Sequence, residues 1–301
     1  MQSIPTLHGK PWAMSLHGGH SGEFCDHGRG TLREVIEAAA ACGYHTFGVT
    51  EHAPRVEPRY LYAEERALGW DVAKIVEDFE AYARALPRLA EEFADRITVL
   101  RGFEIEVVPS DRYVSVMADL RARFEFDYIV GSVHWVDDVI IDYTKAEFDR
   151  AVAAHGGLEA LAVRYYEVVA EMVTALKPEV VGHLDLLRKF AGEDAALETP
   201  AVRRAAGAAL EAIGTYGGIL DCNTVGLRKG LGVPYPAPWL VRLAHEEFGI
   251  GFCFGDDSHG PDEVGAGITE AREYLLGHGV SEITYLARDG DGLARKTALL
   301  E

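Results

Sequence analysis

Short apolar runs alternate with longer amphipathic stretches along almost the whole chain. Seven of these runs have the length and composition of buried strands, at residues 13–17, 46–50, 97–103, 127–132, 180–183, 219–223 and 251–255. The segments between them carry helix signals. Strands that alternate with helices are typical of a parallel α/β architecture, and we expect a closed or distorted barrel rather than an open sheet.

Two of the helices are marked by their ends. Thr31 and Glu34 have the spacing of a capping box, in which each side chain satisfies a free backbone donor, and Gly43 supplies the stop. Thr199 followed by Pro200 predicts the start of another helix, which two consecutive glycines end about 17 residues later. These ends predict helices between the first and second strands and before the sixth.

The stretch between residues 50 and 97 is too long for a simple connection. Apolar residues repeat there at helical spacing, at Val72, Ile75, Val76, Phe79 and Ala83, so at least one inserted helix is predicted. The sequence contains no linker rich in Pro, Gly or Ser, no internal repeat and no low-complexity segment. We therefore expect residues 1–301 to form a single domain.

The charge balance limits the classes of partner. The chain has 29 basic and 48 acidic residues, and its net charge is −19 with histidine neutral. Such a surface repels a phosphodiester backbone, because nucleic-acid affinity depends on Lys and Arg neutralising phosphates. No apolar run reaches the ~20 residues of a membrane span, and the four cysteines form no CxxC. With no signal-peptide pattern at the start, we expect a reduced, cytoplasmic protein without an extended nucleic-acid partner or a membrane.

The histidines carry the strongest chemical signal. Glu104, Asp256 and Asp257 lie at or just beyond the carboxyl end of a predicted strand, or in the loop that follows, as do His17, His20, His27, His52, His134, His183 and His259. In a parallel barrel these ends form one face, where active sites gather. Imidazole and carboxylate ligands suit Zn, Mn or Fe(II) in a catalytic site. Seven histidines and two acids, Glu104 and one of the two aspartates, make nine candidate ligands, which exceeds the need of one ion, so we expect two to three divalent ions with a bridging carboxylate.

Other candidate chemistry is weaker. We expect His8, His45, His155, His245 and His278 to be surface or hydrogen-bonded residues, because they lie in the N-terminal arm, at helix ends or in loops. Cys25 flanks the histidine loops, and we expect an inert, buried side chain there rather than a nucleophile. The absence of GxGxxG, GxxxxGK[ST] and GxSxG patterns disfavours dinucleotide binding, Walker-type phosphate binding and a serine hydrolase.

Seven segments also carry a family resemblance. They read HSGEFCDHG (20–28), VTEHAP (49–54), RGFEIE (101–106), GSVH (131–134), VGHLDLLRKF (181–190), LDCNTVGLRK (220–229) and FGDDSH (254–259). In these segments, and over nearly its whole length, the sequence resembles the PHP (polymerase and histidinol phosphatase) superfamily and, within it, the histidinol-phosphate phosphatases. The resemblance implies a distorted (β/α)7 barrel with its metal cluster at the carboxyl ends of the strands.

The resemblance also assigns the ligands to three ions. It implies that His17, His20, Glu104 and Asp257 hold one ion, and that Glu104, His134 and His183 hold a second. His27, His52 and His259 would hold the third. Asp257 is preferred to Asp256 because it has the family's Asp-x-His spacing with His259.

One departure concerns the first ligands. The family usually opens with His-x-His, whereas this chain has two residues between His17 and His20. On a regular strand the extra residue would turn the two rings to opposite faces. We expect Gly18 and Gly19 to absorb the insertion as a bulge.

The activity that the resemblance implies is metal-dependent hydrolysis of L-histidinol phosphate to L-histidinol and phosphate, as in histidine biosynthesis. A metal-bridging hydroxide would attack phosphorus, Glu104 would bridge two ions, and Asp257 or His259 would relay a proton to the leaving alkoxide. Another PHP phosphoesterase, acting on a nucleotide or other small phosphoester, is the alternative, and a non-catalytic module is a third hypothesis. The near-complete ligand set argues against the third.

Four basic residues follow strands on the same face and are candidates for binding the substrate phosphate. They are Arg188 and Lys189, after His183, and Arg228 and Lys229, after the sixth strand. We expect Arg228 to bind phosphate rather than to stabilise the fold. On that reading, Arg228→Ala would leave metal content and melting temperature unchanged.

Overall fold

The computed structural model describes residues 6–290 and 292–301, and all seven predicted strands are present in it. The strands are short, and most end before the predicted boundary, so that the residues following them leave the sheet. Their bounds are β1 (Met14–Ser15), β2 (Thr46–Val49), β3 (Thr98–Arg101), β4 (Val130–Gly131), β7 (Val180–Val181), β8 (Ile219–Asn223) and β9 (Phe252–Gly255).

These strands form two parallel sheets, in the orders β1-β2-β3 and β4-β7-β8-β9. Glu104, which follows β3, makes parallel bridges to His52 on one side and to Val130 on the other. At the opposite edges, Leu16 N donates to Phe254 O over 2.8 Å, so β1 lies beside β9. The first and last of the seven parallel strands, β1 and β9, are therefore neighbours. The structure is a mixed α/β fold with parallel sheets.

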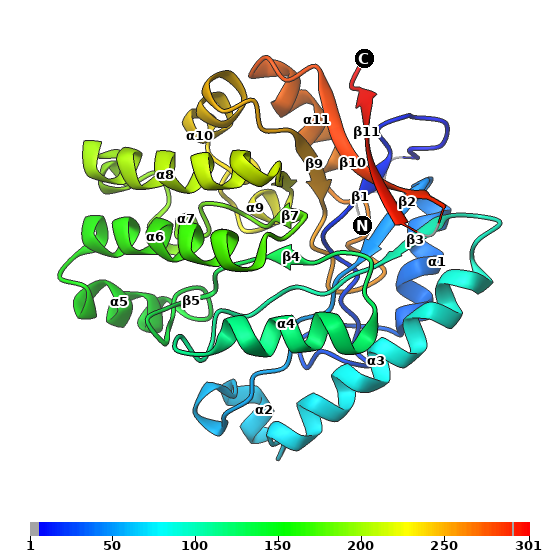
Figure 1. Ribbon diagram of the computed structural model, residues 1–301, viewed down its shortest axis with the longest axis horizontal. Helices are drawn as coiled ribbons and strands as arrows, with labels where there is room; N and C mark the ends of the chain where they lie inside the picture. Colours follow the sequence, from blue (N-terminus) through cyan, green and yellow to red (C-terminus); the bar gives the residue numbers. More distant parts are fainter. Residues whose placement is uncertain (1–5, 291) are drawn as a thin grey trace.

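Helices lie around the outside of the sheets (Figure 1). The α-helices are α1 (Leu32–Cys42), α2 (Ala63–Ala67), α3 (Val72–Glu92), α4 (Tyr113–Phe124), α5 (Lys145–Ala154), α6 (Leu158–Leu176), α7 (Arg188–Ala191), α8 (Pro200–Tyr216), α9 (Val225–Arg228), α10 (Pro238–Arg242) and α11 (Ile268–Gly277). Shorter turns are the 3₁₀-helices η1 (Pro58–Tyr60) and η2 (Ala195–Glu198) and the π-helix η3 (Leu243–Glu247).

The predicted helix ends are confirmed. Thr31 and Glu34 form the capping box of α1, and Gly43 ends it in the left-handed conformation with φ 99°. Helix α8 begins at Pro200 with Thr199 as its N-cap, and a glycine in the left-handed conformation ends it. The inserted helix between β2 and β3 is also confirmed, as α3 preceded by the short α2.

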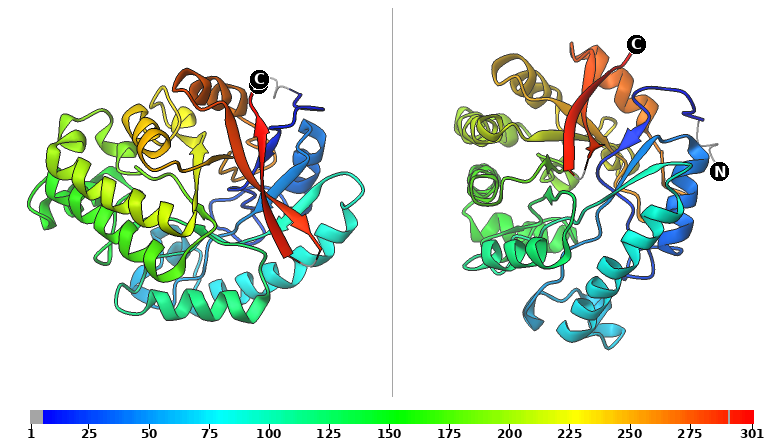
Figure 2. Two further views of the ribbon diagram at one scale, coloured as in Figure 1. Left: turned by 45° about the horizontal axis from the view of Figure 1, so that its top comes forward. Right: turned by 45° about the vertical axis from the view of Figure 1, so that its right-hand side comes forward.

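Two antiparallel hairpins were not predicted. The smaller joins β5 (Trp135–Val136) to β6 (Val139–Ile140), and the larger joins β10 (Glu282–Asp289) to β11 (Gly292–Leu299). Figure 2 shows the larger hairpin as two long red strands that cross one end of the sheets. Most of its residues are not fully buried, so it lacks the continuous apolar run that identified the parallel strands.

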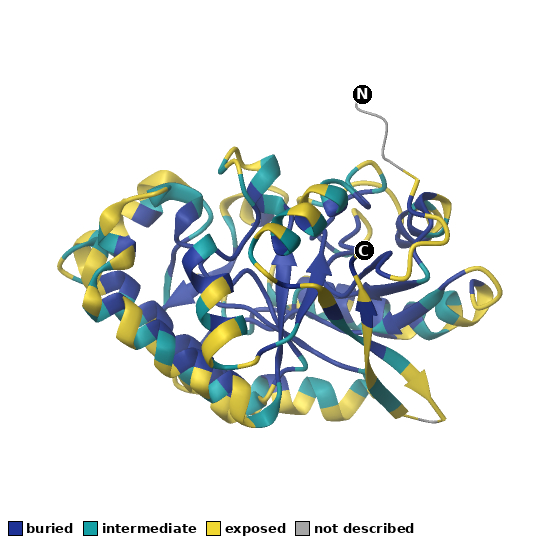
Figure 3. Ribbon diagram, turned by 90° about the horizontal axis from the view of Figure 1, so that it is seen from above, coloured by how far each residue is buried: buried dark blue, intermediate teal, exposed yellow. Residues whose placement is uncertain are grey.

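The apolar core has two parts. One cluster lies among the strands and consists of Leu16, Leu100, Tyr128, Val130, Val180, Ile219, Cys253 and Leu286. A much larger cluster fills the space between strands and helices and includes residues from Leu7 to Leu300. Figure 3 shows this layering, with dark blue strands at the centre and yellow outer faces on the helices. Among the helices of the described residues, none has the length and apolar character that crossing a membrane requires.

Candidate metal centre

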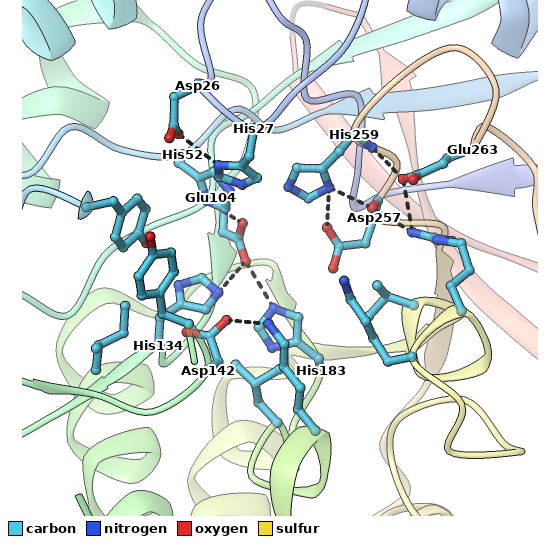
Figure 4. A pocket seen from close by; sticks show the side chains of 18 of the residues that line it. Asp26, His27, His52, Glu104, His134, Asp142, His183, Asp257, His259 and Glu263 are labelled. Atoms are coloured by element: carbon cyan, nitrogen blue, oxygen red, sulfur yellow. Dashed lines mark hydrogen bonds and ion pairs between the residues drawn. The ribbon is translucent and has the colours of Figure 1, made fainter. Parts of the chain in front are cut away.

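Glu104 lies at the centre of the histidine cluster. Its side chain is 1% exposed, and its oxygens lie 2.9 Å from His52 Nδ1 and 3.1 Å from His17 Nε2. The Nε2 atoms of His183 and His134 are 3.2 and 3.4 Å from Glu104 Oε1. Figure 4 shows the carboxylate between His52, His134 and His183, which come from three different loops. The structure thus brings residues far apart in the sequence into one buried group.

The two glycines between His17 and His20 allow both histidines to reach this group. Gly18 and Gly19 have φ values of +151° and +80°, which side chains with a Cβ rarely adopt. A Cβ on Gly18 would lie 2.4 Å from Asp256 Oδ1, so a larger residue does not fit. The chain bends between His17 and His20, and both Nε2 atoms point to Glu104, at 3.1 and 3.8 Å. The expected compensation for the extra residue is therefore present.

The two neighbouring aspartates have different surroundings. Asp257 Oδ1 lies 3.6 Å from His20 Nε2 and 3.7 Å from His259 Nδ1. Asp256 instead accepts hydrogen bonds from the Tyr44 hydroxyl (2.8 Å) and the Gly265 amide (3.0 Å), and burial raises the pKa of Asp256. Asp257 faces the histidines, and Asp256 supports the loop.

The third predicted ligand group contains an additional residue. His27, His52 and His259 come together, and Cys25 Sγ joins them, with all four candidate ligand atoms within 4.8 Å of one another. The ring centroids of His27 and His259 are 4.8 Å apart, and the His27 side chain is 45% exposed. Sequence reasoning set Cys25 aside as an inert buried residue. Its spacing of two from His27 was the available signal.

The donor set fits divalent ions. Five groups of His, Glu, Asp or Cys have ligand atoms within 4.8 Å of one another, and together they include all nine predicted ligands. Within the described residues, several buried ligand atoms lack a hydrogen bond of good geometry: His17 Nε2, both His20 nitrogens, His52 Nδ1 and both Glu104 oxygens. Unsatisfied buried polar atoms are costly, and a bound cation would satisfy them.

The field of the cluster favours an ionised carboxylate at its centre. Burial by itself would raise the pKa of Glu104, but His17, His134 and His52 outweigh that effect and hold the pKa well below its usual range. An ionised Glu104 has two oxygens on which cations can bind. The Glu104 carboxylate is therefore suited to bridge two ions.

A further layer of carboxylates orients the histidines, and sequence reasoning missed it. Asp221 on β8 lies 2.7 Å from His17 Nδ1 and accepts the His183 amide over 2.6 Å. Glu106 Oε2 lies 3.3 Å from His134 Nδ1. Such contacts fix which ring nitrogen carries the proton and direct the other toward an ion. An aspartate in the middle of the apolar strand 219–223 was the signal for Asp221.

A cavity of about 680 Å³ opens beside the cluster, and three of the four predicted phosphate-binding residues line it: Lys189, Arg228 and Lys229. Arg188 is not among its lining residues in the described chain. The Arg188 side chain is 3% exposed, and its guanidinium donates to Glu193 over 2.5 Å and to Pro234 O over 3.4 Å. Its position is that of a buried structural arginine.

Arg228 has a structural role that the sequence did not reveal. Its Nη2 donates to the backbone carbonyls of Asp256 and Asp257, both over 2.8 Å, and Glu263 lies 3.6 Å away. The guanidinium therefore fixes the loop that carries Asp257 while it lines the cavity. The sequence led us to expect that Arg228 binds phosphate and does not support the fold. The second part of that expectation was wrong, because Arg228 supports this loop.

The remaining walls of the cavity combine aromatic, apolar and acidic groups. Tyr62 and Tyr143 stack with their ring centroids 5.2 Å apart. Asp142 lies 3.4 Å from Lys189 Nζ, and although burial raises the pKa of Asp142, Lys189 and His134 outweigh burial and lower it. This side of the cavity suits an organic group that is flat and carries positive charge.

Comparison with known proteins agrees with this geometry. The PHP domain family matches residues 16–225. This chain belongs to the PHP domain family. The chain is 34% identical to the probable histidinol-phosphatase of Schizosaccharomyces pombe, covering 91% of this chain and 89% of that protein. It is 28% identical to the histidinol-phosphatase of Saccharomyces cerevisiae, covering 87% and 88%. Within the PHP domain family, this chain thus lies in the histidinol-phosphatase branch.

Solved structures share the fold of this PHP chain. A crystal structure from Listeria monocytogenes, described as a candidate histidinol phosphatase, has a TM-score of 0.74 and 26% identity, covering 85% of this chain and 99% of that one. The histidinol phosphate phosphatase of Lactococcus lactis, complexed with zinc, L-histidinol and phosphate, has a TM-score of 0.68 and 19% identity, covering 94% and 99%.

Proposed function

We propose that this protein is a metal-dependent phosphomonoesterase that hydrolyses L-histidinol phosphate to L-histidinol and phosphate. The observation that carries this proposal is the buried Glu104 carboxylate among five histidines, at the wall of a cavity that cationic side chains line. The histidinol-phosphatases among its relatives support the choice of substrate.

Two to three divalent ions, of Zn, Fe or Mn, complete the site in this proposal. His17, His20, Glu104 and Asp257 would hold one ion, and Glu104, His134 and His183 would hold another. His27, His52 and His259 would hold the third. Bound ions would lower the pKa of water, neutralise phosphate oxygens and orient the ester. The zinc in the Lactococcus lactis structure supports a divalent metal in this site.

The protein side chains then have distinct tasks. Lys189, Arg228 and Lys229 line the cavity and offer hydrogen bonds and positive charge to the phosphate oxygens. Asp257 or His259 supplies the leaving alkoxide with a proton, since both lie at the cavity wall within 3.7 Å of each other. The aromatic pair Tyr62 and Tyr143 lines the cavity and offers a flat surface for the imidazole ring of histidinol.

We also propose that the seven parallel strands form one distorted (β/α)7 barrel and that residues 1–301 form one domain. The bridges of Glu104 to both sheets and the hydrogen bond between Leu16 and Phe254 support a closed ring of strands. A core that includes residues from Leu7 to Leu300 supports one domain.

The test is phosphate release from L-histidinol phosphate, compared with a panel of nucleotides and other phosphomonoesters, with metal content measured by mass spectrometry. We expect two to three ions per chain, activity that a chelator removes, and the highest kcat/KM on L-histidinol phosphate. Full activity in metal-free protein would contradict the mechanism. A higher kcat/KM on a nucleotide would contradict the substrate.

A further inference from the structure

The group formed by Cys25, His27, His52 and His259 differs from the others by its sulfur. Cys25 is 7% exposed and lies on a tight turn, in which its amide donates to Ser21 O over 3.0 Å and its carbonyl accepts from the Gly28 amide over 3.1 Å. A Cβ on Gly28 would lie 2.5 Å from the Ser21 carbonyl carbon, so the turn admits only glycine there. The turn directs Cys25 and His27 toward the same ligand group.

Cys25 Sγ lies beside the His27 ring, 3.3 Å from Nδ1 and 3.5 Å from Nε2. Zinc lies about 2.3 Å from a cysteine sulfur and about 2.0–2.1 Å from a histidine nitrogen, so tetrahedral angles separate the two ligand atoms by roughly 3.5 Å. Binding of one ion by both side chains therefore requires a rotation of the thiol toward the lone pair of Nε2, because His27 Nδ1 has Asp26 Oδ1 at 2.9 Å. Asp26 thus favours a proton on Nδ1 and leaves Nε2 for an ion.

The two other histidines supply a second observation. His52 Nδ1 is buried and lies 2.9 Å from Glu104 Oε2, which leaves Nε2 as the candidate ligand atom of His52 in this group. The His52 and His259 ring centroids are 5.7 Å apart, and each lies within 5.5 Å of the His27 ring centroid. Three imidazoles around a buried sulfur, with all four candidate ligand atoms within 4.8 Å of one another, form the donor set of a cation site.

We propose that Cys25, as a thiolate, is the fourth protein ligand of the ion held by His27, His52 and His259. On binding, the thiol releases its proton to solvent and the sulfur–metal bond replaces the S–H bond. The inference rests on the proposed metallophosphatase function and gives one of its ions an N₃S ligand set. The other groups offer only nitrogen and oxygen. Because thiolate is a soft ligand, this site favours zinc or cobalt(II) over manganese.

The experiment uses the full-length protein loaded with cobalt(II), because a thiolate bound to cobalt(II) gives a charge-transfer absorption in the near ultraviolet that nitrogen and oxygen ligands do not. The variants are Cys25→Ser and, as a matched control, Cys42→Ser. Cys42 is also buried, but it lies on α1 and its thiol donates to Ala39 O. We expect the absorption in the wild type and in Cys42→Ser and its loss in Cys25→Ser.

Zinc retention gives a second readout. Dialysis of the zinc-loaded proteins against increasing chelator should remove one ion from Cys25→Ser at a chelator concentration at least ~10-fold lower than from Cys42→Ser, as expected for loss of a ligand contact. Persistence of the absorption in Cys25→Ser, or equal zinc retention in both variants, would overturn the proposal.

Hydrolysis of L-histidinol phosphate by the same wild-type preparation separates the two proposals. Hydrolysis without the sulfur absorption rejects only the role of Cys25. The sulfur absorption without phosphate release from any tested ester rejects the proposed function and leaves the ligand assignment standing.

Discussion

The two ends of the same strands have opposite chemistry. At the carboxyl ends lie His and carboxylate side chains, whereas the cluster among the strands below them is apolar and contains Leu16, Leu100, Val130, Val180 and Cys253. In β3, Leu100 belongs to the apolar cluster, and Glu104, four residues later, belongs to the metal centre. The same interval of four separates Val130 from His134 and Cys253 from Asp257.

The difference shows how one short strand serves two purposes. Glu104 continues β3 with parallel bridges to both neighbouring segments, and an interval of four along an extended chain returns a side chain to the same face, so this segment points one apolar and one polar residue inward. The apolar end is closed by the β10–β11 hairpin, which contributes Leu286. Unsatisfied polar atoms at the other end lower stability in the absence of ions. The apolar end of the strands therefore stabilises the fold, whereas the polar end supplies the candidate ligands at a cost in stability.

The largest effect should come from the centre of the polar end. Glu104→Gln removes the charge that a bridging carboxylate provides, so we expect kcat/KM to fall roughly 1,000-fold, or about 4 kcal/mol, with loss of part of the bound metal. The control is Glu106→Gln, whose side chain contacts His134 but not the centre of the group, and its effect should be much milder. If Glu104→Gln and Glu106→Gln lost kcat/KM and bound metal equally, the assignment of Glu104 as the bridging carboxylate would be wrong.

Loss of the phosphate contact at Arg228 should come next. We expect Arg228→Ala to lower kcat/KM about 30- to 1,000-fold, which corresponds to about 2–4 kcal/mol. Because Arg228 also donates to the Asp256 and Asp257 carbonyls, this variant should release metal to a chelator more readily than the wild type. Arg228→Lys restores the charge without the paired donors, so it should recover only part of each loss. Near-normal kinetics in Arg228→Ala would exclude the phosphate contact.

A contact that orients a ligand should have a smaller effect. Asp221→Asn weakens the hold on the His17 ring, and metal affinity should fall about 10- to 100-fold. Asp127→Asn is the control from the other side of the molecule, since Asp127 pairs with Arg101 and Arg288. Its metal affinity, measured by chelator competition, should stay within error of the wild type. A comparable loss in both variants would mean that general destabilisation causes the effect.

The apolar end can be tested without touching the chemistry. Leu286→Ala leaves a cavity in the cluster among the strands, and we expect the free energy of unfolding to fall by about 2–4 kcal/mol. Leu299→Ala, at a side chain that is 61% exposed on the same hairpin, should change it by less than about 0.5 kcal/mol. Denaturant unfolding measures both. A change in kcat at full metal loading in Leu286→Ala would show that the two ends are coupled.

The parts predicted from the sequence are those with a local signal. The seven strands are continuous apolar runs, and the ends of α1 and α8 are set by Thr31 and Thr199 beside them in the chain. The convergence of the histidines followed from one topological rule about parallel strands. The pattern of apolar residues thus predicted that the candidate ligands lie at the carboxyl ends of the strands.

What could not be predicted depends on contacts between distant residues. Asp221 stands out in the sequence as an aspartate in an apolar strand, but its partner His17, 204 positions away, is determined by folding. Arg188 and Lys189 are adjacent in sequence, yet the first is buried against Glu193 and the second lines the cavity. The β10–β11 hairpin lacks a continuous apolar run because it is buried mainly where it meets the other strands.

The contact between β1 and β9, the first and last parallel strands, also determines when the metal centre can form during synthesis. Asp256 N donates to Ser15 Oγ, a contact between residues 241 positions apart. At 5–20 residues per second, a ribosome needs roughly 10–50 s to travel that distance. For most of that interval His17, His20 and His27 have already been made, whereas Asp257 and His259 have not. Metal loading of the complete centre is therefore one of the last events in the life of the nascent chain.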